Sequence, residues 1–91
     1  MATIKVTQEA TLQETDLWQG EVEYNGQKLQ YRYYDGFDSQ EVYVLTEAGW
    51  EQGTELGDII YAACQEWGDP EALGSINEVC EIDDDLIEEY K

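Results

Sequence analysis

Residues 53–68 read GTELGDIIYAACQEWG, and they predict a helix more clearly than any other stretch of the chain. Apolar residues recur at i, i+3, i+4, i+7, i+8 and i+11, which places them on one stripe of a helix of about three and a half turns. The stripe consists of Leu56, Ile59, Ile60, Ala63, Cys64 and Trp67. Thr54 is a suitable N-cap, and Gly68 is a suitable end. The opposite face carries Glu55, Asp58, Tyr61, Gln65 and Glu66, without a cation.

A hairpin precedes this helix at Asn25-Gly26, a pair typical of a two-residue type I′ turn. If Tyr24 faces Gln27, the register also pairs Glu23 with Lys28, Val22 with Leu29, Glu21 with Gln30, Gln19 with Arg32, and Trp18 with Tyr33. This register collects Trp18, Val22, Leu29, Tyr31 and Tyr33 on one face, and polar or charged residues on the other. A slip by one residue would mix the two faces, so the turn and the pattern predict the same register.

Further strands are predicted on both sides of the hairpin. Residues 3–7 alternate like a half-buried strand, whereas residues 8–16 are mostly polar and are interpreted as a connection. A third turn at residues 35–38 leads into a strand at 41–46, whose Val42 should lie beside the apolar face of the preceding strand. Residues 48–53 then link the sheet to the helix, with Trp50 expected to cover the edge of the core.

The C-terminal third offers weaker signals. Asp69-Pro70 resembles the start of a short helical turn that ends at Gly74. Residues 75–78 have capping-box spacing, although residues 78–83 could equally form a strand, and the pattern leaves both possibilities open. The acids at 83–85 precede Leu86, Ile87 and Tyr90 and predict a short final helix.

Together these elements predict an α+β fold in which a three- to four-stranded antiparallel meander packs on one amphipathic helix, with a short acidic C-terminal helix. A length of 91 residues fits a single domain, residues 1–91. With 42% hydrophobic and 12% aromatic residues, the chain should fold in spite of its charge.

Charge is the feature that bears most directly on function. The chain has 22 acidic and 4 basic residues and a net charge of -18, and residues 46–91 contain 14 of those acids. Four cations can neutralise only a few carboxylates, so most acids must face water, counter-ions or another chain. Such a chain should bind basic surfaces and not nucleic acid or anionic membranes.

Catalytic and metal-binding signatures are missing. The sequence has no histidine, and its two cysteines, Cys64 and Cys80, cannot build a closed tetrahedral zinc site. Cys64 is expected to be a buried thiol, and a disulfide with Cys80 would need an oxidising compartment. The acids from Asp83 onward lack the spacing and the glycine of an EF-hand loop, so we expect no dedicated calcium site. We expect no cofactor and no enzymatic activity.

The acid-rich C-terminal region is the candidate binding surface. Its acids are Glu66, Asp69, Glu71, Glu78, Glu81, Asp83, Asp84, Asp85, Glu88 and Glu89. Helical neighbours at i,i+3 or i,i+4 lie about 5–6 Å apart, close to the roughly 7 Å between successive phosphates of a duplex strand. Glu55 and Asp58 extend the surface on the long helix. Tyr34 and Tyr43 should point away from the core, where tyrosine is favoured at protein interfaces.

In size, charge and aromatic content, the chain resembles the small acidic inhibitors of bacteriophages, such as anti-CRISPR and anti-restriction DNA mimics. The resemblance concerns the character of the whole chain and carries over no individual residues. It implies a non-enzymatic protein, a monomer or homodimer, that occupies a basic, nucleic-acid-binding surface of a partner protein. The alternative is an acidic housekeeping subunit or regulator of a larger complex, and a halophile's solubilising surface would also explain the acids.

The expected location is the cytoplasm, which would be the host cytoplasm if the chain is phage-encoded. Its first residues, MATIKVTQEA, lack the apolar core of a secretion signal. No apolar run approaches the roughly 20 residues needed to span a bilayer.

Overall fold

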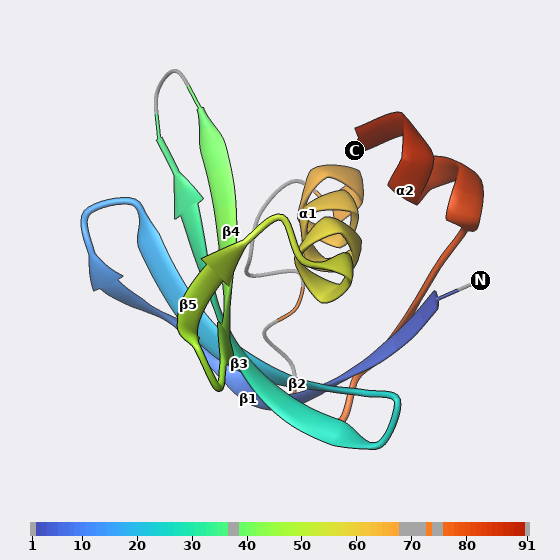
Figure 1. Ribbon diagram of the computed structural model, residues 1–91, viewed down its shortest axis with the longest axis horizontal. Coiled ribbons are helices and arrows are strands. Elements are labelled where there is room, and N and C mark those ends of the chain that lie inside the picture. The colour runs from blue at the N-terminus through green and yellow to red at the C-terminus, as the bar shows by residue number, and fades with distance from the viewer. Residues whose placement is uncertain (1, 37–38, 68–72, 74–75, 91) are drawn as a thin grey trace.

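The computed structural model describes residues 2–36, 39–67, 73 and 76–90. Within these residues the chain forms a six-stranded antiparallel sheet and two helices. The strands are β1 (Ala2–Glu14), β2 (Leu17–Tyr24), β3 (Gln27–Asp35), β4 (Gln40–Thr46), β5 (Gly49–Gln52) and β6 (Val79–Ile82), and the helices are α1 (Glu55–Trp67) and α2 (Asp84–Tyr90). The strand order is β5-β4-β3-β2-β1-β6. The sheet curves around α1, and α2 lies beside α1 (Figure 1).

The core lies between the inner face of the sheet and α1. The strands contribute Ile4, Val6, Val22, Tyr31, Tyr33, Val42, Val44, Cys80 and Ile82. The helix contributes Leu56, Ile59, Ile60, Ala62, Ala63 and Cys64. The predicted apolar stripe is therefore confirmed, except that the side chain of Trp67 lies outside the described part of the chain. Thr54 caps the helix as predicted, since its Oγ1 accepts a hydrogen bond from the Gly57 N–H at 2.9 Å.

The predicted hairpin is also confirmed. Tyr24 pairs with Gln27 and Val22 with Leu29, and every other predicted pair between β2 and β3 is present. The turn residues Asn25 and Gly26 have φ values of 53° and 79°, as a type I′ turn requires. The next strand has the expected parity, because Val42 of β4 pairs with Tyr33 of β3 and both are buried. The turn predicted at 35–38 includes residues 37–38, which lie outside the described residues.

The α+β class is correct, but the sheet has more strands than predicted. Residues 8–16 do not simply connect, because residues 8–14 continue β1 through register irregularities and pair with β2. Residues 49–52 form strand β5, which pairs with β4. Trp50 therefore does not cover the core edge, since its partner Leu45 is exposed on the outer face of the sheet.

The ambiguity at the C-terminal end is also resolved. Residues 79–82 form β6, with Cys80 and Ile82 buried against the core, so the chain adopts the strand of the two possibilities that the pattern left open. The predicted final helix is α2. The helical turn expected at 69–74 falls on residues that, apart from a buried Leu73, lie outside the described ones. Cys64 and Cys80 are both buried, and no disulfide joins them.

Tyr31 and Tyr33 differ in how their buried hydroxyl groups are satisfied. The Tyr33 hydroxyl accepts a hydrogen bond from Gln65 Nε2 at 3.2 Å. The Tyr31 hydroxyl is buried and has no hydrogen-bond partner among the described residues. Its ring also explains Gly20 on β2, because a Cβ there would lie 3.0 Å from the Tyr31 hydroxyl oxygen. The Tyr31 hydroxyl therefore costs stability, whereas the Tyr33 hydroxyl contributes to it.

Removing each hydroxyl should shift stability in opposite directions. We expect Tyr31→Phe to raise the free energy of unfolding by about 1 kcal/mol and Tyr33→Phe to lower it by about 1 kcal/mol. Urea unfolding followed by tryptophan fluorescence measures both values. Equal destabilisation by the two substitutions would contradict the assignment.

Alkaline pH should destabilise the fold. Burial raises the pKa of both Tyr31 and Tyr33 above the ordinary value of 10.0, with smaller contributions from nearby ionisable groups that include Cys64. Because the folded-state pKa exceeds the unfolded one, the phenols of the unfolded chain ionise first, so the free energy of unfolding is unaffected below about pH 10 and falls as the pH rises further. We expect the melting temperature to drop as the pH rises above about 10, less steeply in Tyr31→Phe. An unchanged drop in that variant would contradict this cause.

Candidate functional site

The acids of α1 and α2 lie on the helix side of the molecule, and we call this set of residues the acidic face. It consists of Glu55, Asp58 and Glu66 of α1 and Asp84, Asp85, Glu88 and Glu89 of α2. Neither helix contains a basic residue. Lys91 follows α2 in sequence and lies outside the described residues. Any ligand that approaches from this side therefore meets a negative potential.

The first turns of both helices account for part of this face. The main-chain carbonyl of Asp83 accepts hydrogen bonds from the Leu86 and Ile87 N–H groups at 3.0 and 3.2 Å, which starts α2. Asp84 and Asp85 then lie in its first turn, and Glu55 and Asp58 lie in the first turn of α1. Carboxylates at these positions are stabilised by the positive end of the helix dipole.

Acids in the last turns have no such structural reason. Glu66 lies at the end of α1, Glu88 and Glu89 lie at the end of α2, and neither last turn has a base. A negative charge at the C-terminal end of a helix opposes the dipole by about 0.3–1 kcal/mol. Asp85 and Glu89 are also like charges at i,i+4, which repel each other. Helix stability alone therefore does not explain these acids.

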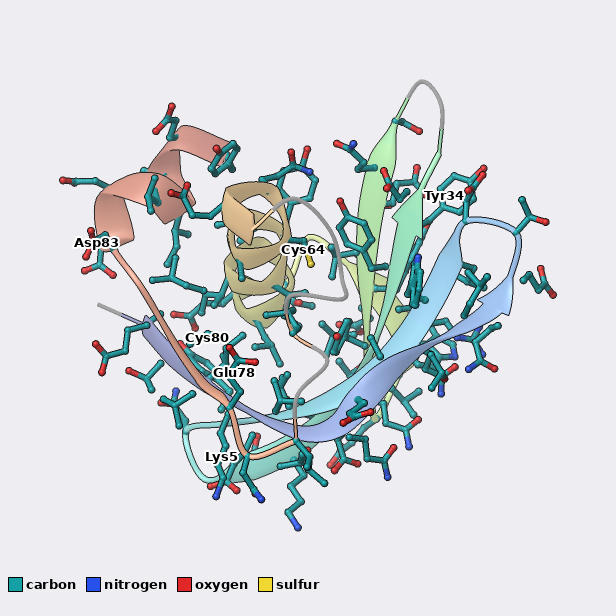
Figure 2. The ribbon with its side chains drawn as sticks, turned by 180° about the vertical axis from the view of Figure 1, so that it is seen from behind. Lys5, Tyr34, Cys64, Glu78, Cys80 and Asp83 are labelled. Carbon is teal, nitrogen blue, oxygen red and sulfur yellow. The ribbon has the colours of Figure 1, made fainter. Side chains whose placement is uncertain are left out.

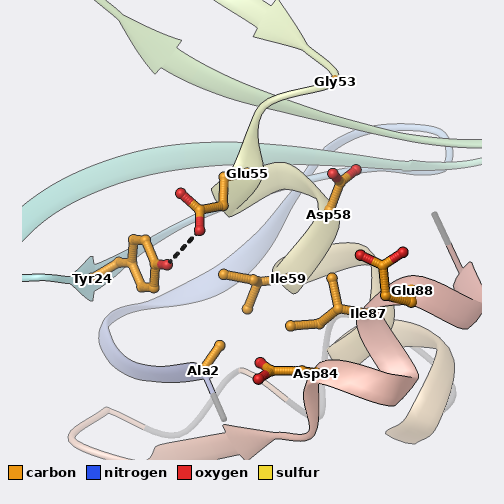
Figure 3. A pocket seen from close by; sticks show the side chains of 9 residues that line it. All are labelled: Ala2, Tyr24, Gly53, Glu55, Asp58, Ile59, Asp84, Ile87 and Glu88. Carbon is orange, nitrogen blue, oxygen red and sulfur yellow. Dashed lines mark hydrogen bonds between the residues drawn. The ribbon is translucent and has the colours of Figure 1, made fainter.

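A groove of about 830 Å³ separates the start of α1 from α2. Its lining combines four carboxylates, from Glu55, Asp58, Asp84 and Glu88, with the apolar side chains of Ala2, Ile59 and Ile87. Figure 3 shows Ile59 and Ile87 between the carboxylates of Glu55 and Asp84. The groove is acidic at its rim and apolar at its floor, a combination that suits a cationic group on an aliphatic stem.

Tyr24 closes one end of this groove. Its hydroxyl donates a hydrogen bond to Glu55 Oε1 at 3.3 Å (Figure 3). Burial raises the pKa of Tyr24, and the charge of Glu55 adds to this effect. The contact joins the β2–β3 hairpin to the start of α1, so it holds the Glu55 carboxylate toward the groove.

α2 is held against α1 by aromatic and apolar contacts. The rings of Tyr61 and Tyr90 pack edge to face, with centroids 6.2 Å apart at an angle of 66°. Leu86 and Ile87 pack against the core. A helix of only two turns is not stable alone, so these contacts fix the second wall of the groove.

The remaining predicted site residues do not all join this face. Glu78 is exposed before β6, and its main-chain carbonyl accepts a hydrogen bond from the Val6 N–H at 2.8 Å. Glu81 points to the outer face of the sheet, because its neighbours Cys80 and Ile82 face the core. Asp69 and Glu71 lie outside the described residues. Because the strand β6 alternates its side chains between two faces, Glu81 does not lie with the acids of the two helices.

Tyr34 and Tyr43 lie on the outer face of the sheet, as predicted, but this places them away from the acidic face. They alternate along β3 and β4 with the buried residues Tyr33, Val42 and Val44. In Figure 2 Tyr34 and Asp83 appear on opposite sides of the molecule. One compact partner surface could not contact both groups, so the tyrosines belong to a second surface.

The sequence did not identify the groove. The sequence predicted Tyr24 in the hairpin, Ile59 on the apolar stripe and Ile87 in the final helix, and their apolar parts do border the core. The sequence did contain two signals, the acids Glu55 and Asp58 at i,i+3 and the acids Asp84 and Glu88 at i,i+4. That these two pairs line the same groove could be predicted only if it were known that α2 packs beside the start of α1.

Searches of protein-family models, curated protein sequences and solved structures found no match to this chain. Within the described residues, no helix is long and apolar enough to cross a membrane. Those residues also contain no group of three or more acidic or cysteine side chains arranged to hold a metal ion.

Neutralising acids in the last turns should stabilise the protein. We expect the double variant Glu66→Gln, Glu89→Gln to gain about 1 kcal/mol of unfolding free energy at about 10 mM salt, because two charges that oppose the helix dipoles are removed. A matched control, Glu9→Gln, Glu47→Gln, changes the net charge equally at exposed positions outside the helices and should gain less.

Added salt should raise the melting temperature of the unmodified chain and reduce the difference between these two variants, because both effects are electrostatic. Urea unfolding at about 10 mM and 0.5 M salt measures this difference. A melting temperature that falls with salt, or equal gains for both variants at low salt, would contradict the proposed repulsion.

Proposed function

We propose that this chain is a non-enzymatic binding protein whose acidic face occupies a basic, nucleic-acid-binding surface of a partner protein. It would act as a DNA mimic, in the manner of anti-CRISPR and anti-restriction inhibitors, in the cytoplasm where such partners work. The observation that carries the proposal is the concentration of seven acids and no base on the two helices.

The geometry of the acids supports mimicry. Asp84 and Glu88, and likewise Asp85 and Glu89, are spaced by one turn of α2, and Glu55 and Asp58 by nearly one turn of α1. Such neighbours lie about 5–6 Å apart, within reach of lysine and arginine side chains that normally contact successive phosphates. A folded scaffold holds these charges in place, so a partner does not have to order them on binding.

The groove supports a cationic anchor from the partner. A lysine or arginine side chain can lay its aliphatic stem on Ile59 and Ile87 while its charged end reaches the carboxylates of Asp58, Asp84 or Glu88. An arginine also has the planar fork that pairs with a carboxylate through two hydrogen bonds. We propose this groove as the centre of the contact and the outer acids as the source of electrostatic steering.

The mechanism follows from these two parts. The high net negative charge accelerates association with a basic surface, and this acceleration is lost as salt screens the charges. Contacts in the groove slow dissociation, since they are short-ranged and partly desolvated. While bound, the chain excludes nucleic acid from the same surface because both ligands need the same cations.

Capture of partners from a lysate of the native host tests this function. The immobilised chain should retain nucleic-acid-binding proteins, and added duplex DNA should release them by competing for the same surface. The triple variant Asp58→Asn, Asp84→Asn, Glu88→Gln should lose at least about tenfold in affinity for the retained protein, equivalent to about 1.4 kcal/mol. Isosteric amides are used because lysines would also disturb the helix starts.

The matched control is Glu9→Gln, Glu14→Gln, Glu47→Gln, which removes three exposed acids outside the helices. It should keep most of the affinity and differ mainly in association rate. Equal losses of affinity in both triple variants would mean that binding depends on the net charge of the chain and not on the groove. Retained proteins that DNA does not release would favour an acidic subunit of another complex and would refute mimicry.

A further inference from the structure

The outer face of the sheet carries a second surface, which is aromatic and centred on a hollow of about 370 Å³. The hollow is lined by Leu17, Arg32, Tyr34, Glu41, Tyr43 and Trp50, which come from β2, β3, β4 and β5. Next to it, Leu45 is 36% exposed, and Tyr34 itself is 38% exposed. Exposed aromatic and apolar side chains gathered around a hollow are typical of protein interfaces.

The side chains of this hollow are held in place by their own contacts. The Arg32 guanidinium lies 4.3 Å from the centre of the Trp50 ring, and its Nε donates a hydrogen bond to Gln19 Oε1 at 3.1 Å. The Tyr43 hydroxyl donates a short hydrogen bond to Glu41, which raises the pKa of Tyr43. Rings that are already ordered lose little conformational entropy when a partner covers them.

The charge of this face differs from that of the rest of the chain. All three bases in the described residues, Lys5, Lys28 and Arg32, point outward from the sheet. Between them lie the acids Glu21, Glu23 and Glu41, and Glu14 and Glu81 stand at the margins. A chain of net charge -18 thus gathers its described bases on one face, where three bases stand among five acids.

We propose that a second copy of this chain docks on this outer face, with the two aromatic hollows in contact. A copy of the same acidic chain is repelled by the acidic face, which has no base, whereas here it meets three bases among five acids and the repulsion is weaker. In a two-fold arrangement the same surface serves both copies, so Arg32 of one copy can approach Glu41 of the other. A basic partner, in contrast, is drawn to the acidic face.

The dimer leaves both acidic faces free, because the helices lie on the opposite side of each sheet (Figure 2). It would display two acidic faces that point away from each other. The inference does not depend on the proposed function, since it concerns a different face and a different partner.

Sedimentation equilibrium of the full chain tests the dimer. Two highly acidic copies repel each other at low salt, so we expect the 10.5 kDa monomer at about 10 mM salt and a growing share of twice that mass at about 0.5 M salt and about 0.5 mM protein. This salt dependence is opposite to that expected for binding a basic partner, which salt weakens. The two proposals can therefore fail separately.

A pair of leucine substitutions locates the interface. Leu45→Glu places a charge beside the hollow and should raise the dimer dissociation constant at least about tenfold. Leu12→Glu introduces the same charge at a residue that is 56% exposed and that pairs with Trp18, away from the hollow. It should leave the dissociation constant within about threefold of the unmodified chain. A chain that remains monomeric at high salt, or a dimer weakened equally by both substitutions, would overturn the proposal.

Discussion

Repulsion among uncompensated carboxylates is the constraint on which the rest of this structure depends. A net charge of -18 on 91 residues must be held together by a core in which none of the described buried residues is charged. The apolar stripe of α1 against the curved inner face of the sheet supplies that core. Burial of apolar area is insensitive to charge at the surface, so it can hold acids close together that would otherwise separate.

This core also divides the charge between two sides. The sheet has one face toward α1, and its other face carries the three described bases among five acids. The charged residues of the helices on the opposite side are all acids. The molecule therefore has one face whose charged groups are all acids, which we propose binds a basic partner, and one aromatic face of mixed charge, which we propose contacts a second copy. The two proposals arise from this division.

The sequence predicted those parts of the fold whose local signals agree with their tertiary role. Asn25-Gly26 fixed a hairpin register, and the period of residues 56–64 fixed the buried side of α1. Residues 11–14 of β1 gave no strand signal because all of them are exposed, so no alternation marks them. Trp50 was misplaced because its large apolar ring is compatible with a core, while its actual partner is the Arg32 guanidinium on the outer face.

The site was predictable in kind but not in arrangement. Composition identified acids as the important groups, yet only the packing of α2 beside α1 brings Asp84 and Glu88 to the same groove as Glu55 and Asp58. Strand alternation separates Glu81 from them, and the two sides of the sheet separate Tyr34 and Tyr43 from them. No pattern in a single chain segment contains this information.

Hydrogen–deuterium exchange of the chain, free and bound to its captured partner, tests the central claim most directly. If the acidic face is the contact, backbone amides of residues 55–59 and 84–90 should exchange more slowly in the complex, while those of β3 to β5 should not change. Protection confined to β3, β4 and β5 would contradict it, because the partner would then sit on the aromatic side of the sheet.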